Sequence, residues 1–287
     1  MIHMQIAKTI AEITASVAQA RKAGKTIGFV PTMGALHDGH VSLIEAAATR
    51  CGHVVVSIFV NPTQFGPGED LNKYPRPFEK DLAICEKHGA DTVFAPQVQE
   101  MYPRENLTWV NVEQLTDRLC GEFRPGHFRG VATVCAKLFD IVCPDVAFFG
   151  QKDAQQALVI RRMVADLNMP LEIVVCPTVR EPDGLAMSSR NQYLSPQERK
   201  DATRIARSLE RCLESIEAGE RAAEVLRGQI RQILEQMPAT RIEYISICDS
   251  ETLEELDRVR GRVLVAVAVR MKSARLIDNI LVDTPAR

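Results

Sequence analysis

The sequence lacks the features that mark membrane, secreted and nucleic-acid-binding proteins. No apolar run approaches the roughly 18 residues that a membrane-spanning helix needs, and the N-terminus has no signal-peptide core. The 35 lysine and arginine residues are balanced by 37 aspartate and glutamate residues, so the net charge of -2 lacks the basic excess of a dedicated nucleic-acid binder. We therefore expect a cytoplasmic protein with no membrane or nucleic-acid partner.

Disulfide and zinc motifs are also missing. The eight cysteines contain no C-x-x-C pair and mostly lie inside apolar patterns, which predicts small buried side chains rather than disulfides or metal ligands. A zinc site would need a third ligand, typically in the motif H-E-x-x-H, whereas Asp38 and Gly39 stand between His37 and His40. A zinc site is therefore disfavoured.

Two common nucleotide-binding fingerprints fail as well. Gly24-Lys25-Thr26 resembles the end of a phosphate loop, but Gln19 stands where that loop needs its first glycine. Gly24 is better explained as the stop of an amphipathic helix at residues 6–23. The dinucleotide glycine fingerprint is absent after the first predicted strand, so a nicotinamide-dependent oxidoreductase is disfavoured.

The sequence does contain a clear strand, loop and helix near its start. An apolar run at residues 27–31 is followed by the polar, glycine-containing loop T-M-G-A-L-H-D-G-H. Val41, Ile44 and Ala48 then recur at helical spacing. The start of such a helix presents unpaired N–H groups and a partial positive charge, so this junction favours an anion.

Two histidines lie at that helix start. His37 and His40 are three residues apart, and Gly34 and Gly39 let the backbone approach a ligand closely. Near a helix N-terminus an imidazole tends to stay neutral, so each ring would donate one N–H to a phosphate chain. An H-x-x-H pair without function is common, and on this pair alone that alternative stays open.

The alternation of apolar strands with helical patterns continues along the chain. Strands are predicted at residues 54–60, 92–95, 107–112, 146–149 and 171–175, and helices at 78–88, 131–142 and 154–167. This rhythm predicts an α/β fold with a doubly wound parallel sheet of the Rossmann type. Ligands of such sheets bind outside the carboxyl ends of the strands, where the strand order reverses.

Polar residues follow several of these strands. Asn61 and Gln64 lie in a long loop after the strand at 54–60, and Gly150-Gln151-Lys152-Asp153 follows the strand at 146–149. Met187-Ser188-Ser189-Arg190 comes shortly after the strand at 171–175, and Arg124 lies in a further glycine-containing loop. Turn-forming roles for the two amides and a surface charge for Arg124 remain the alternatives. The convergence of the loops at one sheet edge favours a site.

A second domain is predicted from residue 185 to residue 287, after a first domain at 1–184. Ser195, Pro196 and Glu198 form a capping box with proline at the first helical position, so a helix begins there. It is expected to end before Gly219 and to be followed by a helix to about 236 and strands at 242–248, 263–269 and 276–281. The prediction is a small α+β domain that acts as a lid.

The H-x-x-H and M-S-S-R motifs resemble the HIGH and KMSKS pair of the adenylate-forming and nucleotidyl-transferring superfamily. A closer resemblance is to the pantothenate synthetase family. It rests on blocks spread from Val30 to Ser195: V-P-T-M-G-A-L-H-D-G-H, I-F-V-N-P-T-Q-F, Y-P-R, R-P-G-H-F-R-G-V, F-F-G-Q-K-D-A-Q-Q and M-S-S-R-N-Q-Y-L-S. The family's usual G-E-K-D stands here as G-Q-K-D, which keeps the lysine and the aspartate.

The resemblance implies an ATP-dependent condensation of pantoate with β-alanine through a pantoyl adenylate, releasing AMP and pyrophosphate. It implies Mg²⁺ as a cofactor, with Asp81 as a weak candidate ligand, and a homodimer. His40, His37 and Lys152 would be catalytic, and pantoate and β-alanine would contact Gln64, Gln156, Asn61, Tyr74 and Arg124. ATP would contact Met33, Gly34, Ala35, Leu36, His37, Asp38, Gly39, His40, Gly150, Gln151, Lys152, Asp153, Val179, Met187, Ser188, Ser189 and Arg190.

Two other functions stay open at this point. A nucleotidyltransferase of the same superfamily would leave the nucleotide on a phosphorylated acceptor, for which the loop with Asn61 and Gln64 offers no extra basic residue. A nucleotide-sensing module without chemistry is the other alternative, and the retention of both histidines, Lys152 and M-S-S-R disfavours it.

Overall fold

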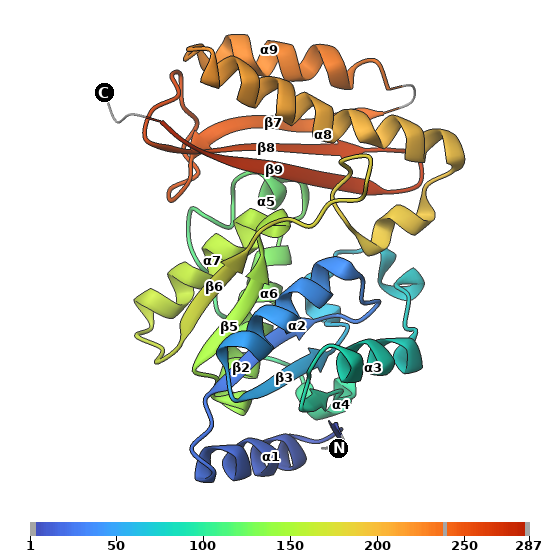
Figure 1. Ribbon diagram of the computed structural model, residues 1–287, viewed down its shortest axis with the longest axis vertical. Helices are drawn as coiled ribbons and strands as arrows, with labels where there is room; N and C mark the ends of the chain where they lie inside the picture. The colour runs from blue at the N-terminus through green and yellow to red at the C-terminus, as the bar shows by residue number, and fades with distance from the viewer. Residues whose placement is uncertain (1–3, 238–239, 285–287) are drawn as a thin grey trace. The chain divides into compact units, whose positions relative to one another are not determined.

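The computed structural model describes residues 4–237 and 240–284 (Figure 1). The chain divides into two compact units. Unit 1 contains the chain up to Thr116, together with Arg124–Gln151 and Gln155–Pro177. Unit 2 contains the chain from Thr178 onward, and so begins ahead of the boundary expected between residues 184 and 185. It also takes in Asp117–Phe123 and Lys152–Ala154.

Unit 1 is built on a six-stranded sheet in the order β1-β4-β3-β2-β5-β6, and all of its strand pairs are parallel. This confirms the predicted doubly wound α/β fold. The strand order reverses between the neighbours β2 and β5. The strands are β1 (Gln5–Ala7), β2 (Ile27–Thr32), β3 (His53–Ile58), β4 (Thr92–Phe94), β5 (Val146–Gly150) and β6 (Glu172–Cys176).

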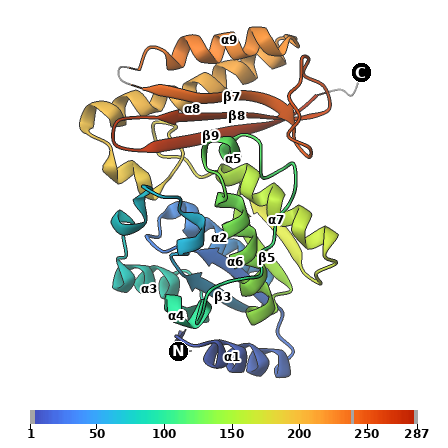
Figure 2. The same ribbon diagram turned by 180° about the vertical axis from the view of Figure 1, so that it is seen from behind.

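Helices connect these strands, as both ribbon views show (Figures 1 and 2). The α-helices are α1 (Ile10–Lys22), α2 (Asp38–Arg50), α3 (Phe78–Lys87), α4 (Val98–Met101), α5 (Cys120–Phe123, in unit 2), α6 (His127–Val142) and α7 (Ala154–Asp166). Short 3-10 helices are η1 (Pro62–Gln64), η2 (Asp70–Lys73), η3 (Gln151–Asp153) and, in unit 2, η4 (Ser189–Tyr193).

Side chains alternate across the parallel strands and so build a core on each face of the sheet. Val30 and Phe148 join one buried cluster with Leu43 of α2. Their neighbours point the other way: the ring of Phe29 lies 6.3 Å from that of Phe139 on α6. The sheet is therefore buried between helices on both faces, which leaves the carboxyl ends of its strands as the place for a site.

The first predicted helix is too long at its start. Residues 5–7 instead form β1, which pairs with β4, and α1 begins after Thr9 because Thr9 and Glu12 make a reciprocal capping box. The predicted end is confirmed, since Gly24 takes the left-handed conformation (φ 74°) that terminates helices. In α2, Ala48 is exposed and the buried positions are Leu43, Ile44 and Ala47, so the predicted helix is right but its buried face is rotated.

The strand predicted at residues 107–112 is wrong. This segment has no regular secondary structure, and Leu107 is 83% exposed. The backbone N–H of Val110 donates to Oγ1 of Thr133 on α6, so a side chain takes the place of a neighbouring strand. Alternating apolar residues cannot form a strand where no sheet edge is offered to them.

Unit 2 pairs three antiparallel strands, β7 (Arg241–Asp249), β8 (Arg262–Arg270) and β9 (Arg275–Asp283), with helices α8 (Pro196–Glu217) and α9 (Ala223–Leu234). The predicted capping box is present: Oγ of Ser195 accepts from the N–H of Glu198, whose carboxylate accepts from the N–H of Ser195 at 2.9 Å. This end of the chain matches the predicted α+β pattern closely.

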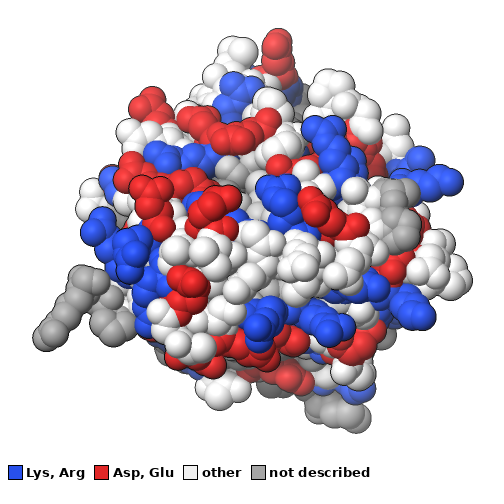
Figure 3. Space-filling view, turned by 90° about the horizontal axis from the view of Figure 1, so that it is seen from above, with Lys and Arg blue, Asp and Glu red and all other residues white. Residues whose placement is uncertain are grey.

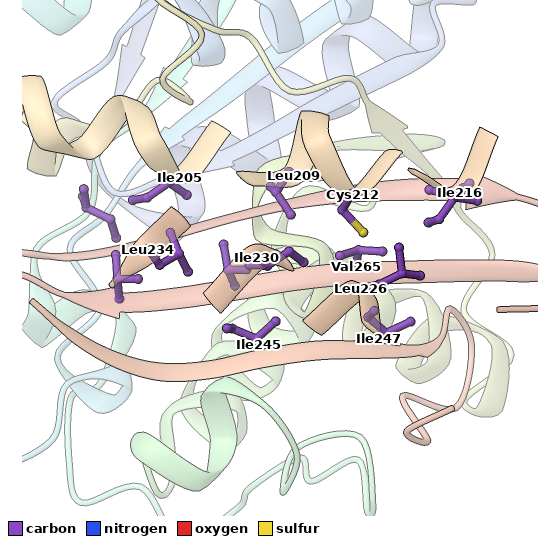
Figure 4. Close-up of a cluster of buried hydrophobic side chains, with 14 of the residues drawn as sticks. Ile205, Leu209, Cys212, Ile216, Leu226, Ile230, Leu234, Ile245, Ile247 and Val265 are labelled. Atoms are coloured by element: carbon purple, nitrogen blue, oxygen red, sulfur yellow. The ribbon is translucent and has the colours of Figure 1, made fainter. Parts of the chain in front are cut away.

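The core of unit 2 lies between its two long helices and its sheet (Figure 4). Leu209 and Cys212 of α8, Ile230 of α9 and Ile247 and Val265 of the strands point toward one another, and each is at most 1% exposed. Burial of such side chains contributes roughly 1.5–3 kcal/mol each. The sheet of unit 2 is therefore held firmly against α8 and α9.

The cysteine side chains and the surface charges largely follow the expectations drawn from the composition. All eight cysteines are free thiols, and six are buried, but Cys51 is half-buried and Cys143 is exposed where it caps α6. On the face seen in Figure 3, acidic and basic side chains are interspersed, in line with the nearly balanced charge. Among the described residues, no helix is long and apolar enough to cross a membrane.

Candidate functional site

The two histidines shape the start of α2. His37 is the N-cap residue, and its Nδ1 accepts from the backbone N–H of Gly39 at 3.2 Å. Nδ1 of His40 accepts in turn from the backbone N–H of His37 at 3.3 Å, and the two rings lie 4.2 Å apart. A nitrogen that accepts carries no proton, so each neutral ring holds its proton on Nε2. This geometry agrees with the expected pair of single N–H donors.

The loop before these histidines is fixed by a buried carboxylate. Asp81 on α3 is 1% exposed; its Oδ2 accepts from the N–H of Ala35 and its Oδ1 from the N–H of Leu36, both at 2.8 Å. Ala35 has a φ of 52°, a left-handed conformation that a non-glycine residue adopts only when its surroundings impose it. Burial raises the pKa of Asp81, and the two backbone hydrogen bonds offset that rise only in part.

Asn61 and Gln64 form one hydrogen-bonded cluster after β3. Nδ2 of Asn61 donates to Oε1 of Gln64 at 3.2 Å, and Nε2 of Gln64 contacts the sulfur of Met33 at 3.0 Å. Both amides are buried, with Asn61 1% and Gln64 8% exposed. The structure thus brings three of the predicted contact residues together, and it assigns Asn61 a structural hydrogen bond as well.

Two residues that support this cluster were missed from the sequence. Oδ1 of Asn61 accepts from the hydroxyl of Tyr102 at 3.0 Å, and Nδ2 of Asn61 donates to the carbonyl of Gly130 at 3.2 Å. A Cβ atom placed on Gly130 would lie 2.3 Å from the carbonyl oxygen of Thr63. Only glycine allows α6 to approach the loop this closely, and the sequence gives no signal of that contact beyond the motif R-P-G-H-F-R-G.

Arg124 lies against the same loop and is held by an acidic partner. Its guanidinium donates to both carboxylate oxygens of Glu69, at 2.7 and 2.6 Å, and to the carbonyl of Gln64 at 3.3 Å. Nδ1 of His127 lies 2.8 Å from the same carbonyl. Burial raises the pKa of Glu69, but the hydrogen bonds and charge of Arg124 outweigh it, so the pKa is lowered overall. Neither Glu69 nor His127 was predicted as a site residue.

The point at which the strand order of the sheet reverses lies next to the loops that follow β2 and β5. β2 and β5 are hydrogen-bonded neighbours, with Phe29 opposite Ala147. The histidine loop follows β2, and Gly150 ends β5, so these two predicted ATP segments of unit 1 leave the sheet from adjacent strands at the same edge. Gln151 follows Gly150 and begins η3.

Two further predicted residues of unit 1 have packed surroundings. Tyr74 is 6% exposed and its ring makes an edge contact with Phe65, with centroids 6.1 Å apart. Gln156 is half-buried on α7. Its neighbour Gln155 is buried and donates to the carbonyl of Leu115 at 2.8 Å, which makes Gln155 part of the framework.

The other predicted residues belong to unit 2. Lys152 and Asp153 lie in η3, with Nζ of Lys152 3.7 Å from a carboxylate oxygen of Asp153. Val179 and Met187 face each other in a narrow hairpin, in which the N–H of Met187 donates to the carbonyl of Val179 at 3.0 Å. Oγ of Ser188 then accepts from the N–H of Arg190 at 3.3 Å and caps η4, the helix that Ser189 begins.

The described residues do not form a protein-held metal site. They contain no group of three histidine, cysteine, aspartate or glutamate side chains placed to hold an ion. Asp81, the candidate considered for Mg²⁺, directs both oxygens at backbone N–H groups.

A doubly wound sheet with a histidine pair at the start of α2, next to the switch point, defines the class: an α/β protein of the kind that binds nucleotides at the carboxyl ends of its strands. Comparison with known proteins narrows the class. The family model described as pantoate-beta-alanine ligase matches residues 5–281. The chain belongs to this family.

Individual relatives are similar over nearly their whole length. The chain is 55% identical to the pantothenate synthetase of Pelotomaculum thermopropionicum, over 97% of this chain and 99% of that protein. The crystal structure of pantothenate synthetase from Thermus thermophilus matches with a TM-score of 0.92 at 48% identity, covering 96% of this chain and 99% of that one. A pantoate-beta-alanine ligase from Francisella tularensis, complexed with beta-gamma ATP and beta-alanine, matches with a TM-score of 0.79 at 34% identity, covering 97% and 98%.

Proposed function

We propose that this protein condenses pantoate with β-alanine at the expense of ATP, forming pantothenate, AMP and pyrophosphate. The observation that carries the proposal is the match to the pantoate-beta-alanine ligase family over residues 5–281. The buried amide cluster and the histidine pair support it, because amides can hold the hydroxyl and carboxylate oxygens of a hydroxy acid and the helix start suits a phosphate chain.

The reaction needs ATP because a carboxylate is a poor electrophile at neutral pH. In the first step a carboxylate oxygen of pantoate attacks the α-phosphorus of ATP in line, and pyrophosphate leaves. In the second step the amine of β-alanine attacks the activated carboxyl carbon, AMP leaves with the oxygen, and the amine loses a proton. Both steps depend on positioning and on stabilising the negative charge that grows on phosphoryl oxygens.

His37 and His40 are assigned to that growing charge. Their Nδ1 atoms accept backbone N–H groups, so the remaining proton of each neutral ring is on Nε2. Two such donors at a helix start can follow the phosphate oxygens through the reaction without adding full charges. Lys152 and Arg190 would add positive charge, and Ser188 and Ser189 would donate hydroxyl hydrogen bonds.

Gln64, Gln156 and Asn61 are assigned to pantoate, with Gln64 also near β-alanine. Amide groups can hold hydroxyl and carboxylate oxygens without competing for the phosphates. The ion pair between Arg124 and Glu69 favours a loop-building role for Arg124 over a direct charge on the substrate. Tyr74 would close one side of the pocket through its packed ring. The remaining ATP contacts are assigned to residues 33–40, 150–153, 179 and 187–190.

Further parts of the proposal follow the family resemblance. Mg²⁺ would arrive with ATP, held by phosphate oxygens and water. We also propose a cytoplasmic homodimer, in which the domain from residue 185 onward shields the adenylate from water. Light scattering tests the dimer. Limited proteolysis with and without ATP plus pantoate tests the shielding, which predicts slower cleavage when both are present.

The experiment that tests the function is product analysis by chromatography. The purified chain is incubated with ATP, pantoate and Mg²⁺, with and without β-alanine. Catalytic amounts of AMP, pyrophosphate and pantothenate, formed only when every substrate is present, are expected. If no product forms, but pyrophosphate appears with a phosphorylated acceptor, the proposed substrates are wrong and the protein is a nucleotidyltransferase.

A further inference from the structure

Two adjacent residues of β9 reach two different segments of unit 2 that the proposed function assigns to ATP. Asp278 and Asn279 are 2% and 5% exposed. Oδ2 and Oδ1 of Asp278 accept from the guanidinium of Arg180 at 2.6 and 3.1 Å. Nδ2 of Asn279 donates to the backbone carbonyl of Lys152 at 2.9 Å. One dipeptide is therefore linked to the nucleotide hairpin and to the catalytic lysine.

The link through Asp278 fixes the hairpin at its base. Arg180 pairs with Ala186 across the hairpin, and its Nη1 also donates to the carbonyl of Gly184 at 3.0 Å. The guanidinium of Arg180 thus reaches from one arm of the hairpin to its turn, while its Nη1 and Nη2 atoms both donate to Asp278. A bidentate, largely buried pair of this kind sets direction as well as distance. Val179 and Met187, the neighbours of this bridge, are held with it.

The link through Asn279 acts on backbone rather than on side chain. Lys152 lies in a three-residue 3-10 helix, and the hydrogen bond to its carbonyl holds the backbone from which its side chain extends. Successive residues of a strand point to opposite faces, so β9 supports the hairpin from one face and Lys152 from the other. Asn279 is paired with Ala266 of the buried strand β8, and Figure 1 shows β8 running beside β9 along its length.

We propose that Asp278 and Asn279 are positioning residues that hold Lys152 and the hairpin at residues 179–187 in fixed register for one ATP molecule. The proposal rests on the proposed function, because it takes Lys152 and the hairpin as ATP contacts. A lysine reaching a phosphate and a hairpin reaching the rest of the nucleotide act together only at one separation. Because β9 pairs along its length with the buried strand β8, it can hold that separation constant.

The test substitutes Asn279 and Arg180, the partner of Asp278, in the full-length protein. Asn279→Asp replaces the N–H donor by an oxygen that repels the carbonyl of Lys152. We expect the KM for ATP to rise about tenfold and kcat to fall about tenfold, with the KM for β-alanine unchanged. Arg180→Lys keeps both charges but loses the fork, and we expect its KM for ATP to rise about fivefold. The affinity of each variant for a non-hydrolysable ATP analogue, measured by calorimetry, should fall by a similar factor to the rise in its KM for ATP.

A matched control lies on the same strand. Asp283→Asn makes the reverse change, from acid to amide, at a side chain that is 82% exposed, and it should leave every kinetic constant and the melting temperature unchanged. If Asn279→Asp changes the KM for ATP less than twofold, the positioning proposal is wrong. It is equally wrong if the constants for ATP and β-alanine worsen together in proportion to a lost melting temperature, because that pattern means a purely structural role.

The two proposals fail in different ways. If the unaltered protein makes no pantothenate, the proposed function fails. Binding of the ATP analogue to the unaltered protein and to Asn279→Asp still decides whether β9 positions a nucleotide. If the unaltered protein makes pantothenate and both variants bind the analogue normally, only the positioning role of β9 is overturned.

Discussion

Two loops assigned to ATP are held in contrasting ways. The loop at residues 33–36 is fixed by one buried carboxylate, Asp81, whose oxygens accept directly from two backbone N–H groups. The hairpin at residues 179–187 is held through charged side chains, with Arg180 on Asp278 and Arg199 on both Glu181 and Asp183, at 2.5 and 2.7 Å. The loop at residues 33–36 is thus held through its backbone N–H groups, and the hairpin is held through its charged side chains.

The difference has a physical consequence for each loop. A carboxylate that accepts from backbone N–H groups fixes the chain without ordering a second side chain, and it can hold a left-handed residue such as Ala35 in place. The ion pairs of Arg199 with Glu181 and Asp183 join partly exposed side chains, so they are weakened by salt and contribute roughly 0–1 kcal/mol each, whereas the carboxylate of Asp278 is buried. We therefore expect the loop at 33–36 to be rigid and single substitutions around it to be severe. In the hairpin, a single substitution removes one ion pair and leaves the others in place.

The largest expected effect is on the histidine that the rigid loop presents. His40→Ala should lose about 10²-fold or more in turnover with the fold intact, equivalent to about 2.7 kcal/mol of lost charge stabilisation. Steady-state kinetics and circular dichroism measure this. His88→Ala, which removes a histidine paired with Glu45 away from the loop, is the control and should keep full turnover. Near-normal turnover in folded His40→Ala would remove His40 from the mechanism.

A second substitution separates steric from conformational effects of glycine. Gly130→Ala places a Cβ 2.3 Å from the carbonyl oxygen of Thr63, so the backbone must shift, at an expected cost of about 1–3 kcal/mol in the free energy of unfolding. Gly228→Ala in α9 meets nothing within 4 Å and should instead stabilise by about 0.5–1 kcal/mol. Urea unfolding measures both. Opposite signs are expected, and equal effects would mean that the close approach of α6 to the loop is not strictly required.

The anchor of the rigid loop gives a smaller effect. Asp81→Asn keeps one acceptor but turns an N–H donor toward a backbone N–H, so the loop at 33–36 should loosen. We expect kcat/KM for ATP to fall about tenfold, or about 1.4 kcal/mol, with most of the loss in KM. Asp140→Asn, on the exposed face of α6, is the matched control. An unchanged KM for ATP in Asp81→Asn would show that the loop holds its conformation without the carboxylate.

The smallest effect concerns the charged network of unit 2 and depends on pH. Hydrogen bonds from Ser273 and from the backbone of Ser195 lower the pKa of Glu198 to about 2, below its ordinary value of 4.5. A lowered pKa means that the folded state favours the charged form, so its stabilisation is present above pH 4.5 and is lost as the pH falls toward 2. Because solvent screens the partly exposed carboxylate of Glu198, Glu198→Gln should cost only about 1 kcal/mol at pH 7.

Measuring the stability difference between the unaltered protein and Glu198→Gln at several pH values tests this. The difference should shrink steadily between pH 4.5 and pH 2. A difference that stays constant over that range would show that the hydrogen bonds of Glu198, rather than its charge, account for its contribution.

Much of the fold follows from local sequence chemistry. The capping box at Ser195 and Glu198, the glycine stop at Gly24 and the continuous apolar strands each act within a few residues, so their outcome can be read from the chain. The strand predicted at 107–112 failed for a related reason. Its alternating apolar pattern is local, but the pairing partner that a strand requires is not.

The residues of the candidate site likewise fall into those that the sequence identifies and those that only the folded chain brings together. By itself the sequence determined the parallel α/β sheet, the histidine pair at a helix start and the family to which the chain belongs. Only the tertiary structure decided what holds those residues: Asp81 under the loop at 33–36, Gly130 against Thr63, and Asp278 and Asn279 behind the segments of unit 2. The histidines depend on backbone geometry set by their immediate neighbours, whereas each support comes from 40 or more residues away and exists only once the chain has folded.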